Sequence, residues 1–342
     1  MKITKIETEI KQIELKTPFK TALRTATHVE FVRVHVEDEN GNLGIGEAPA
    51  TKAITGEDIE IILSSIESVK EQFLNLTCRN SLSLLHTGCV IGSSAKAALD
   101  IAFVSLDAKQ KNRSLAEYFC IEDFTPIKTD ITISLNEADV MLSDAKKAYV
   151  EKKEILKVKV GSDILHAVDV IRKIANELPH AEILVDANQA WSFEDSQFFI
   201  NNMLGVKIEL IEQPVIASDL DSLKMLSELS HIPILADEAV FSLEDVKKVM
   251  ESKSADMINI KLMKCGGVTK AIEILEYARE KKVTCMLGSM LEGPYSINMA
   301  LYLAFAYRDV IKYVDLDSPL LYKEPSSELD FEFNGCEISL KK

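Results

Sequence analysis

The stretch Ile155–Gly161, "ILKVKVG", has the β-branched and aliphatic composition of a strand buried on both faces, yet it carries Lys157 and Lys159. Side chains in a strand alternate between its two faces, so residues two apart point to the same side. Two like charges on one face of a buried strand are costly unless another group compensates them. The stretch therefore predicts a buried strand whose two ammonium groups serve a site.

Short apolar segments of this kind alternate with helical stretches from about residue 127 onward. Eight such segments interleaved with seven helix-like stretches predict a parallel β/α barrel. The segments are "TDITIS", "ILKVKV", "EILVDA", "KIELIEQP", "IPILADE", "DMINIKL", "VTCMLGS" and "IKYVDLD". We therefore predict an α/β barrel over residues 125–315.

The chain before the barrel has a different pattern. Residues 1–50 alternate as strands do, and Asn40-Gly41 is a strong signal for a hairpin turn. Residues 57–120 are helical in pattern, so residues 1–124 are predicted to form an α+β domain. The tail, 316–342, contains no further strand–helix unit, and we expect it to pack back on this first domain.

Composition limits the classes of function. The 342 residues carry a net charge of −15, which argues against a nucleic-acid surface. The N-terminus has no apolar signal core, and no apolar run is long enough to span a membrane. Six scattered cysteines without a C-x-x-C pair are typical of free thiols in a reducing compartment. We expect a cytoplasmic protein.

One polar residue closes most of the predicted barrel strands. In a parallel barrel the C-terminal strand ends meet at one mouth, where active sites lie. The spacing therefore predicts that these dispersed side chains form one ring. The residues are Lys159, Asp186, Glu212, Asp237, Lys261 and Asp315.

Asp186, Glu212 and Asp237 end three consecutive strands, and three converging carboxylates repel one another unless a cation neutralises them. Oxygen ligands without a nearby His or Cys favour Mg²⁺ over zinc. The strands that carry Lys157, Lys159 and Lys261 flank this trio, so a lysine could lie on either side of a bound substrate's α-carbon. Neighbouring cations should also lower the lysine pKa values.

The order K-x-K, D-x-N, E-Q-P, A-D-E and N-I-K-L-M-K-x-G-G resembles the enolase superfamily, muconate-lactonising subgroup, over nearly the whole chain. The resemblance implies a modified (β/α)₇β barrel under an α+β capping domain of residues 1–124 completed by 316–342. It also implies one Mg²⁺ per subunit on Asp186, Glu212 and Asp237. Lys159 and Lys261 would be the acid/base pair, a use of lysine that is known for this superfamily, and Lys157 would contact the substrate carboxylate.

Asp315-x-Asp317 in "VDLDSPLL" resembles the D-x-D motif of the dipeptide epimerases, where two carboxylates hold a substrate ammonium. "PFKTALRTATH" resembles their capping loop for L-Ala-D/L-Glu, in which Arg24 would bind the glutamate side chain through its planar guanidinium. "ATKAITGE" resembles the second covering loop. The same resemblance makes Thr132, Ser289 and Leu291 line the substrate and Glu292 a further candidate.

The expected activity is therefore epimerisation of a small dipeptide, most simply L-Ala-D/L-Glu, at the C-terminal residue. Three alternatives stay open. The substrate could be a hydrophobic or cationic dipeptide. The enzyme could be an N-succinylamino-acid racemase or o-succinylbenzoate synthase, although two acids at the mouth speak against it. The barrel could be a non-catalytic binding protein, although each expected ligand and base is present. A homo-oligomer is possible.

Overall fold

The computed structural model describes residues 1–22 and 25–341. Its first part is an antiparallel sheet of three strands, β1 (Ile3–Lys20), β2 (Thr25–Asp38) and β3 (Leu43–Pro49). The turn between β2 and β3 is closed by Asp38, whose Oδ1 accepts the N–H groups of Asn40 (2.9 Å) and Asn42 (3.0 Å). Gly41 takes the positive φ (+79°) that the turn requires. The predicted hairpin at Asn40-Gly41 is confirmed.

The helices of this first part cover one face of the sheet. They are α1 (Lys52–Thr55), α2 (Ile59–Val69), the 3₁₀ turn η1 (Lys70–Phe73), α3 (Cys78–Thr87), α4 (Ser93–Gln110) and α5 (Leu115–Tyr118). Helix α4 approaches β3 closely, because a Cβ at Gly46 would lie 2.0 Å from the Ala98 carbonyl oxygen. Gly44 and Gly46 therefore allow strand and helix backbones to touch.

The barrel has eight parallel strands in the described residues, hydrogen-bonded in sequence order. They are β5 (Ile131–Ile133), β6 (Ile155–Lys159), β7 (Glu182–Asp186), β8 (Leu210–Glu212), β9 (Ile234–Ala236), β10 (Met257–Lys261), β11 (Thr284–Gly288) and β12 (Ile311–Asp315). The main-chain N–H of Asp130 donates to the Val314 carbonyl (3.0 Å), which brings the first and last strands together. The predicted barrel is confirmed.

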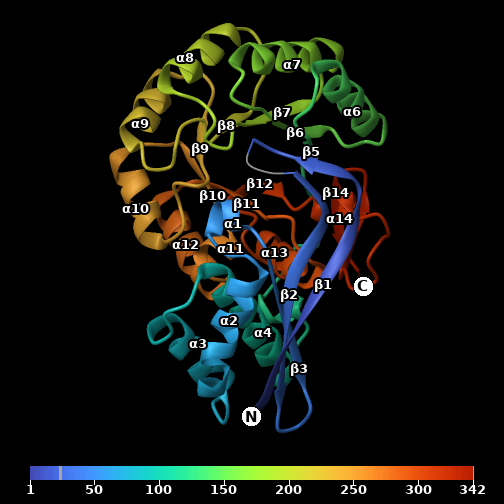
Figure 1. Ribbon diagram of the computed structural model, residues 1–342, viewed down its shortest axis with the longest axis vertical. Helices are drawn as coiled ribbons and strands as arrows, with labels where there is room; N and C mark the ends of the chain where they lie inside the picture. Colours follow the sequence, from blue (N-terminus) through green and yellow to red (C-terminus); the bar gives the residue numbers. More distant parts are fainter. Residues whose placement is uncertain (23–24, 342) are drawn as a thin grey trace.

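Helices connect the strands and surround them. They are α6 (Ala138–Val150), α7 (Ile164–Glu177), α8 (Phe193–Asn202), α9 (Leu220–Leu229), α10 (Leu243–Ser252), α12 (Val268–Lys281) and α13 (Pro294–Ala306), with the short α11 (Leu262–Cys265) between β10 and α12. Figure 1 shows α6–α10 as an arc at one end of the molecule and α2–α4 at the other. The long strands β1 and β2 run between the two ends.

Side chains that point into the barrel alternate along each strand with side chains that point outward, and this alternation determines what fills the barrel. One apolar side chain from each of seven strands forms a buried layer: Ile155, Leu184, Leu210, Leu235, Met257, Met286 and Tyr313. The residue two positions later on the same strand has the same orientation. On β7 this residue is Asp186, which follows Leu184, and on β8 it is Glu212, which follows Leu210. The apolar floor therefore fixes which polar side chains point toward the mouth.

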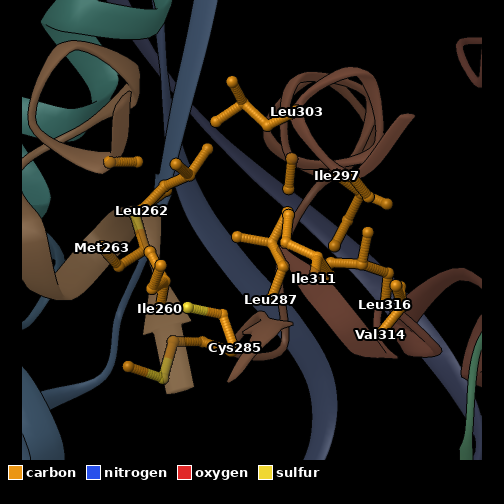
Figure 2. Close-up of a cluster of buried hydrophobic side chains, with 14 of the residues drawn as sticks. Ile260, Leu262, Met263, Cys285, Leu287, Ile297, Leu303, Ile311, Val314 and Leu316 are labelled. Carbon is orange, nitrogen blue, oxygen red and sulfur yellow. The ribbon is translucent and has the colours of Figure 1, made fainter. Parts of the chain in front are cut away.

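The outward faces of the strands pack on the helices. Figure 2 shows Ile260 of β10, Leu287 of β11 and Val314 of β12 together with Ile297 and Leu303 of α13. Helix α13 is buried along almost its whole length because it lies between the barrel and the capping part. The longest apolar run of the sequence is thus a core helix. No helix in the described part of the chain is both long and apolar enough to cross a bilayer.

The tail contacts both parts of the molecule. Helix α14 (Ser318–Leu321) is followed by β13 (Phe331–Asn334) and β14 (Glu337–Leu340), which pairs with β4 (Ile127–Lys128). Leu15 of β1 forms a bridge with Tyr322. The guanidinium of Arg33 donates to both carboxylate oxygens of Glu328, at 2.7 Å each. The domain division at 124/125 and 315/316 stays a prediction.

Candidate active site

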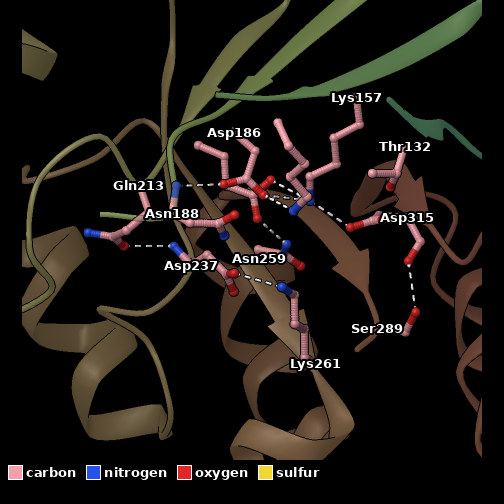
Figure 3. Close-up of polar contacts among 12 residues, drawn as sticks. Thr132, Lys157, Asp186, Asn188, Gln213, Asp237, Asn259, Lys261, Ser289 and Asp315 are labelled. Carbon is pink, nitrogen blue, oxygen red and sulfur yellow. Dashed lines mark hydrogen bonds and ion pairs between the residues drawn. The ribbon is translucent and has the colours of Figure 1, made fainter. Parts of the chain in front are cut away.

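The two lysines of β6 point to the same side of the strand, as their spacing requires. Lys157 is fully buried, and its Nζ lies 2.6 Å from Asp315 Oδ2, 2.7 Å from Glu212 Oε2 and 3.2 Å from Asp186 Oδ2. Lys159 Nζ also contacts Asp186 Oδ2. The buried ammonium groups are therefore compensated by carboxylates from β7, β8 and β12 (Figure 3).

The third carboxylate of the predicted trio lies on the other side of the mouth. Asp237, directly after β9, binds Lys261 Nζ through Oδ2 at 2.6 Å and Lys264 Nζ through Oδ1. Its main-chain N–H donates to Gln213 Oε1 at 3.0 Å. Glu212 Oε1 accepts a hydrogen bond from Asn259 Nδ2 at 2.8 Å. The structure thus brings the six predicted strand-end residues together around one buried polar centre.

The expected lowering of the lysine pKa values is wrong for two of the three lysines. Burial alone lowers the pKa of Lys157, but Asp315, Glu212 and Asp186 raise it well above its ordinary value. Burial likewise lowers the pKa of Lys261, and Asp237 then raises it above the usual range. The physical reason is that each ammonium touches a carboxylate, whereas the sequence suggested cations as the dominant neighbours.

The carboxyl groups respond to the same contacts. Burial raises the pKa of Asp186, but Lys159 and Lys157 hold it below its ordinary value, and Lys261 and Lys264 do so for Asp237. Glu212 differs, because burial and the neighbouring Asp186 raise its pKa to about 7. The negative charge of Glu212 is therefore less well compensated than the charges of Asp186 and Asp237.

Asp315 is the last residue of β12, and Asp317, two residues later, contacts Thr132 on β5. Asp317 Oδ2 accepts the Thr132 N–H at 2.7 Å, and the Asp315 carbonyl accepts the Ser289 N–H at 3.0 Å. Burial and then Asp315 raise the pKa of Asp317 to about 6. Oxygens of Asp130, Asp315 and Asp317 lie within 4.8 Å of one another. This tight acidic group suits a cation with several N–H donors, such as an ammonium.

The capping part supplies the opposite wall of the cavity over these residues. It contributes Phe19, Thr21, Thr51, Ala53 and Ile54, while the barrel contributes Thr132, Lys159, Lys261, Ser289, Met290 and Leu291. The end of β1 is tied to the barrel by the Leu135 N–H, which donates to the Lys20 carbonyl at 3.1 Å. The predicted Arg24 lies outside the described residues, so its predicted role stays a prediction.

The trio has the composition of a hard-metal site. Its ligand atoms are all carboxylate oxygens, and two neighbouring oxygens are buried without a hydrogen-bond donor: Glu238 Oε2 and Asn188 Oδ1. Buried acceptors without donors are unfavourable, and a cation with its bound water would satisfy them. In the described part of the chain the carboxylate oxygens of Asp130, Asp315 and Asp317 lie closer to one another than those of the trio. Each carboxylate of the trio is instead bound to a lysine. The residues nonetheless fit Mg²⁺ at the trio.

Three residues of this centre, Asn188, Glu238 and Lys264, lie in the D-x-N, A-D-E and N-I-K-L-M-K-x-G-G motifs but received no predicted role. Asn188 Nδ2 donates to Glu238 Oε1 at 3.3 Å, and both line the cavity. Lys264 donates to Asp237 and to the Asn259 carbonyl (3.0 Å). Asp130 lies two residues before Thr132, so the strand period of two places both side chains on the same face. This spacing could have identified Asp130 as a site residue. Lys264 sits in a helical turn that directly follows β10, which strand periodicity does not reveal.

Two family descriptions match the chain. "Mandelate racemase / muconate lactonizing enzyme, N-terminal domain" matches residues 4–119, and "Enolase C-terminal domain-like" matches residues 140–340. The chain therefore belongs to the mandelate racemase/muconate lactonizing enzyme family, with an enolase C-terminal domain-like barrel. The predicted resemblance to this superfamily is confirmed.

Individual relatives refine the comparison. The chain is 70% identical over 338 residues, 99% of either chain, to the L-amino acid-D/L-Glu epimerase of Sulfurimonas denitrificans. A solved structure of the L-Ala-D/L-Glu epimerase from Bacillus subtilis in a substrate-liganded complex has a TM-score of 0.94 at 35% identity, covering 100% of this chain and 97% of that one. The dipeptide epimerase from Enterococcus faecalis, complexed with Mg and L-Leu-L-Tyr, has a TM-score of 0.92 at 29% identity and covers 100% and 98%.

Proposed function

We propose that this protein is a Mg²⁺-dependent dipeptide epimerase, an isomerase that inverts the α-carbon of the C-terminal residue, with L-Ala-D/L-Glu as the preferred substrate. One observation carries the proposal: Lys159 and Lys261 bind carboxylates on opposite sides of one mouth, and a tight acidic group lies beside them. The relatives named above support the same reaction and substrate class.

Asp186, Glu212 and Asp237 would hold one Mg²⁺ per subunit. When bound, the ion would offset the charge of the substrate carboxylate and of the enediolate formed from it. Lys157 lies between Asp186, Glu212 and Asp315, so a carboxylate entering the centre would find its ammonium group directly beneath. The proposed role of Lys157 is therefore to bind this carboxylate.

The proton transfer uses one lysine on each face of the α-carbon. The reaction requires one of Lys159 and Lys261 as a neutral amine, so on the Lys261 face it has to overcome the contact with Asp237 that raises the pKa of this lysine. The neutral amine takes the α-proton, and the C–H bonding pair moves into the carboxylate to give an enediolate. The ammonium of the opposite lysine then donates its proton to the same carbon from the other face. The two lysines have exchanged protonation states, and the stereocentre is inverted.

The free amino end of the dipeptide is proposed to sit at Asp315 and Asp317, with Thr132, Ser289 and Leu291 lining the substrate. An ammonium offers three donors, and the acidic group offers several acceptors within reach of one nitrogen. An N-succinylated substrate has no such cation, which disfavours the racemase and o-succinylbenzoate synthase alternative. A non-catalytic barrel would have no use for two lysines set against three carboxylates.

The test is α-proton exchange followed by NMR in D₂O. L-Ala-L-Glu is incubated with the protein in Mg²⁺ or in EDTA, with Lys159→Ala and Lys261→Ala as controls. The expected result is Mg²⁺-dependent loss of the glutamate α-proton signal, with epimerisation abolished in either variant. Epimerisation at the normal rate in Lys261→Ala would overturn the two-base scheme. If no dipeptide showed α-proton exchange, the proposed function would be wrong.

A second candidate keeps the chemistry and changes the substrate to a hydrophobic dipeptide. Part of the cavity wall is apolar, with Phe19, Ile54, Met290 and Leu291. Turnover of Ala-Glu against Ala-Phe, in the wild type and in Arg24→Met, separates the two. Preference for Ala-Glu that disappears in Arg24→Met supports the acidic substrate, and preference for Ala-Phe supports the hydrophobic one.

We also propose a cytoplasmic location. All six cysteines are free, which suits a reducing compartment. Cell fractionation with activity measurements tests this proposal. Recovery of the activity in a secreted fraction would contradict it.

A further inference from the structure

A carboxylate of the capping part accepts a hydrogen bond from the first turn of a barrel helix. Asp100 on α4 is fully buried, and its Oδ1 accepts the Thr269 N–H at 3.1 Å in the first turn of α12. Its Oδ2 lies 2.8 Å from His86 Nε2. A Cβ at Gly267, where φ is +113°, would lie 2.5 Å from Asp100 Cβ. Only a glycine lets the helix start approach Asp100 this closely.

This helix start is connected to Lys261 by a short and rigid path. Strand β10 ends at Lys261, the single turn α11 follows, and the N–H groups of Gly266 and Gly267 both donate to the Leu262 carbonyl, at 3.0 and 2.9 Å. Leu262 and its neighbour Met263 are buried. A displacement at Thr269 would therefore be transmitted to Lys261 instead of being absorbed by a loop.

The neighbouring barrel helix has the same construction. Glu47 of β3 is fully buried, and its Oε2 accepts the N–H groups of Tyr295 (2.8 Å) and Ser296 (3.4 Å) at the start of α13. Arg33 Nε donates to its Oε1 at 2.8 Å. A Cβ at Gly293 would lie 2.5 Å from Glu47 Oε2. The loop before this helix carries Ser289 and Leu291, which line the cavity.

We propose that Asp100 and Glu47 are positioning residues, through which the capping part sets two different features of the active site. Asp100 holds the segment that follows Lys261, and Glu47 holds the substrate-lining loop 289–291. The catalytic part of this inference rests on the proposed epimerase function. The two contacts should differ in effect, because one acts on a proton-transfer group and the other on the substrate-binding wall.

The chain contains a matched control for the loss of such a contact. Asp38 is a buried carboxylate of the capping part, and its Oδ1 accepts the N–H groups of Asn40 (2.9 Å) and Asn42 (3.0 Å) in the turn between β2 and β3. The carboxylate and the turn both belong to the capping part and lie outside the cavity wall. Replacement of Asp38 thus removes the same kind of contact without touching the connection to the barrel or the covering loop.

The experiment compares Asp100→Ala, Glu47→Ala and Asp38→Ala with the wild type, because alanine leaves no acceptor for the N–H groups that each carboxylate binds. Deuterium exchange at the α-carbon is measured separately for Ala-L-Glu and Ala-D-Glu, together with KM, kcat and Tm. Asp100→Ala should slow exchange of one epimer at least ten-fold more than the other, since Lys261 serves only one face. Glu47→Ala should raise KM for both epimers alike, and Asp38→Ala should lower Tm while leaving KM and the exchange ratio unchanged.

A second measurement does not need turnover. Hydrogen–deuterium exchange of backbone amides, read by mass spectrometry, should be faster across 262–269 in Asp100→Ala and unchanged there in Asp38→Ala. If Asp100→Ala does not fold, Gly267→Ala is used, because its Cβ forces the helix start away from Asp100. Unchanged amide exchange at 262–269, or a wild-type epimer ratio, would overturn the inference. A wild type without α-proton exchange would instead refute the proposed function and leave the amide measurement decisive for the inference.

Discussion

Lys157 Nζ on β6 lies 2.6 Å from Asp315 Oδ2 on β12, so this ion pair links, inside the barrel, the two strands that flank β5. The same ammonium lies 2.7 Å from Glu212 Oε2, and Lys157 has no exposed surface. A buried ammonium that contacts several carboxylates is a structural requirement as well as a functional group, because its removal leaves buried anions unpaired.

Lys157→Met should therefore destabilise the fold by about 3–5 kcal/mol, the usual cost of leaving a buried charge without its partner. Urea denaturation followed by circular dichroism measures the change. Lys207→Met is the control, because the Lys207 side chain is 72% exposed and pairs only at the surface with Glu209. That control should change stability by no more than about 0.5 kcal/mol. Equal effects of the two variants would contradict the prediction.

Removal of the metal should be measurable without substrate. A ligand at 100 times its Kd stabilises the state that binds it by about 2.7 kcal/mol, so Mg²⁺ should raise the urea midpoint of the wild type and EDTA should lower it. Glu212→Gln should remove most of this increment. Asp130→Asn should retain it, because Asp130 belongs to the neighbouring acidic group. The opposite pattern would place the cation at Asp130, Asp315 and Asp317.

Much of this centre follows from the sequence alone because two periodicities coincide. The strand period of two puts Asp186 on the same side as Leu184, and the β/α repeat puts Asp186 beside Glu212 at one mouth. These rules do not reveal contacts that cross between domains. The hydrogen bond from the Thr269 N–H to Asp100 depends on how α4 packs against the barrel, and no local sequence pattern encodes this packing.

The sign of the lysine pKa shifts shows a different limit. The sequence placed lysines and carboxylates in one ring, but it could not say which of them touch. Lys261 lies 2.6 Å from Asp237 Oδ2, and at that distance one carboxylate outweighs a more distant ammonium. Spacing along the chain predicts neighbourhood, whereas the direction of a pKa shift depends on the last few ångströms.

Gly288 should be required for the geometry of Lys261. A Cβ at Gly288 on β11 would lie 2.7 Å from Asn259 Oδ1 and 3.1 Å from Lys261 Cε. Gly288→Ala should push the lysine aside, and a displacement of about 1 Å at a reacting group costs about 100-fold in rate. The kcat for Ala-Glu epimerisation measures the effect. Gly161→Ala is the control, since its Cβ would meet only the flexible end of Leu135 at 3.1 Å. Full activity in Gly288→Ala would rule out this steric role.

Glu292 should make the fold less stable as the pH rises. It is fully buried, its Oε1 accepts the Met290 N–H at 2.8 Å, and burial raises its pKa to about 7 from an ordinary value of 4.5. The folded state therefore holds a proton that the unfolded chain has released, so the contribution of Glu292 is fully present below pH 4.5 and is lost as pH rises through 7. The shift corresponds to roughly 3 kcal/mol.

Glu292→Gln should remove this pH dependence, since the amide keeps an acceptor for Met290 and does not titrate. Urea denaturation at several pH values between 4.5 and 7.5 should show that the wild type loses stability relative to the variant by an amount of this order. Glu332→Gln, on the exposed side of β13, controls for the loss of one carboxylate. Parallel stability curves for wild type and Glu292→Gln would mean that Glu292 is ionised in the folded protein, with a compensating cation nearby.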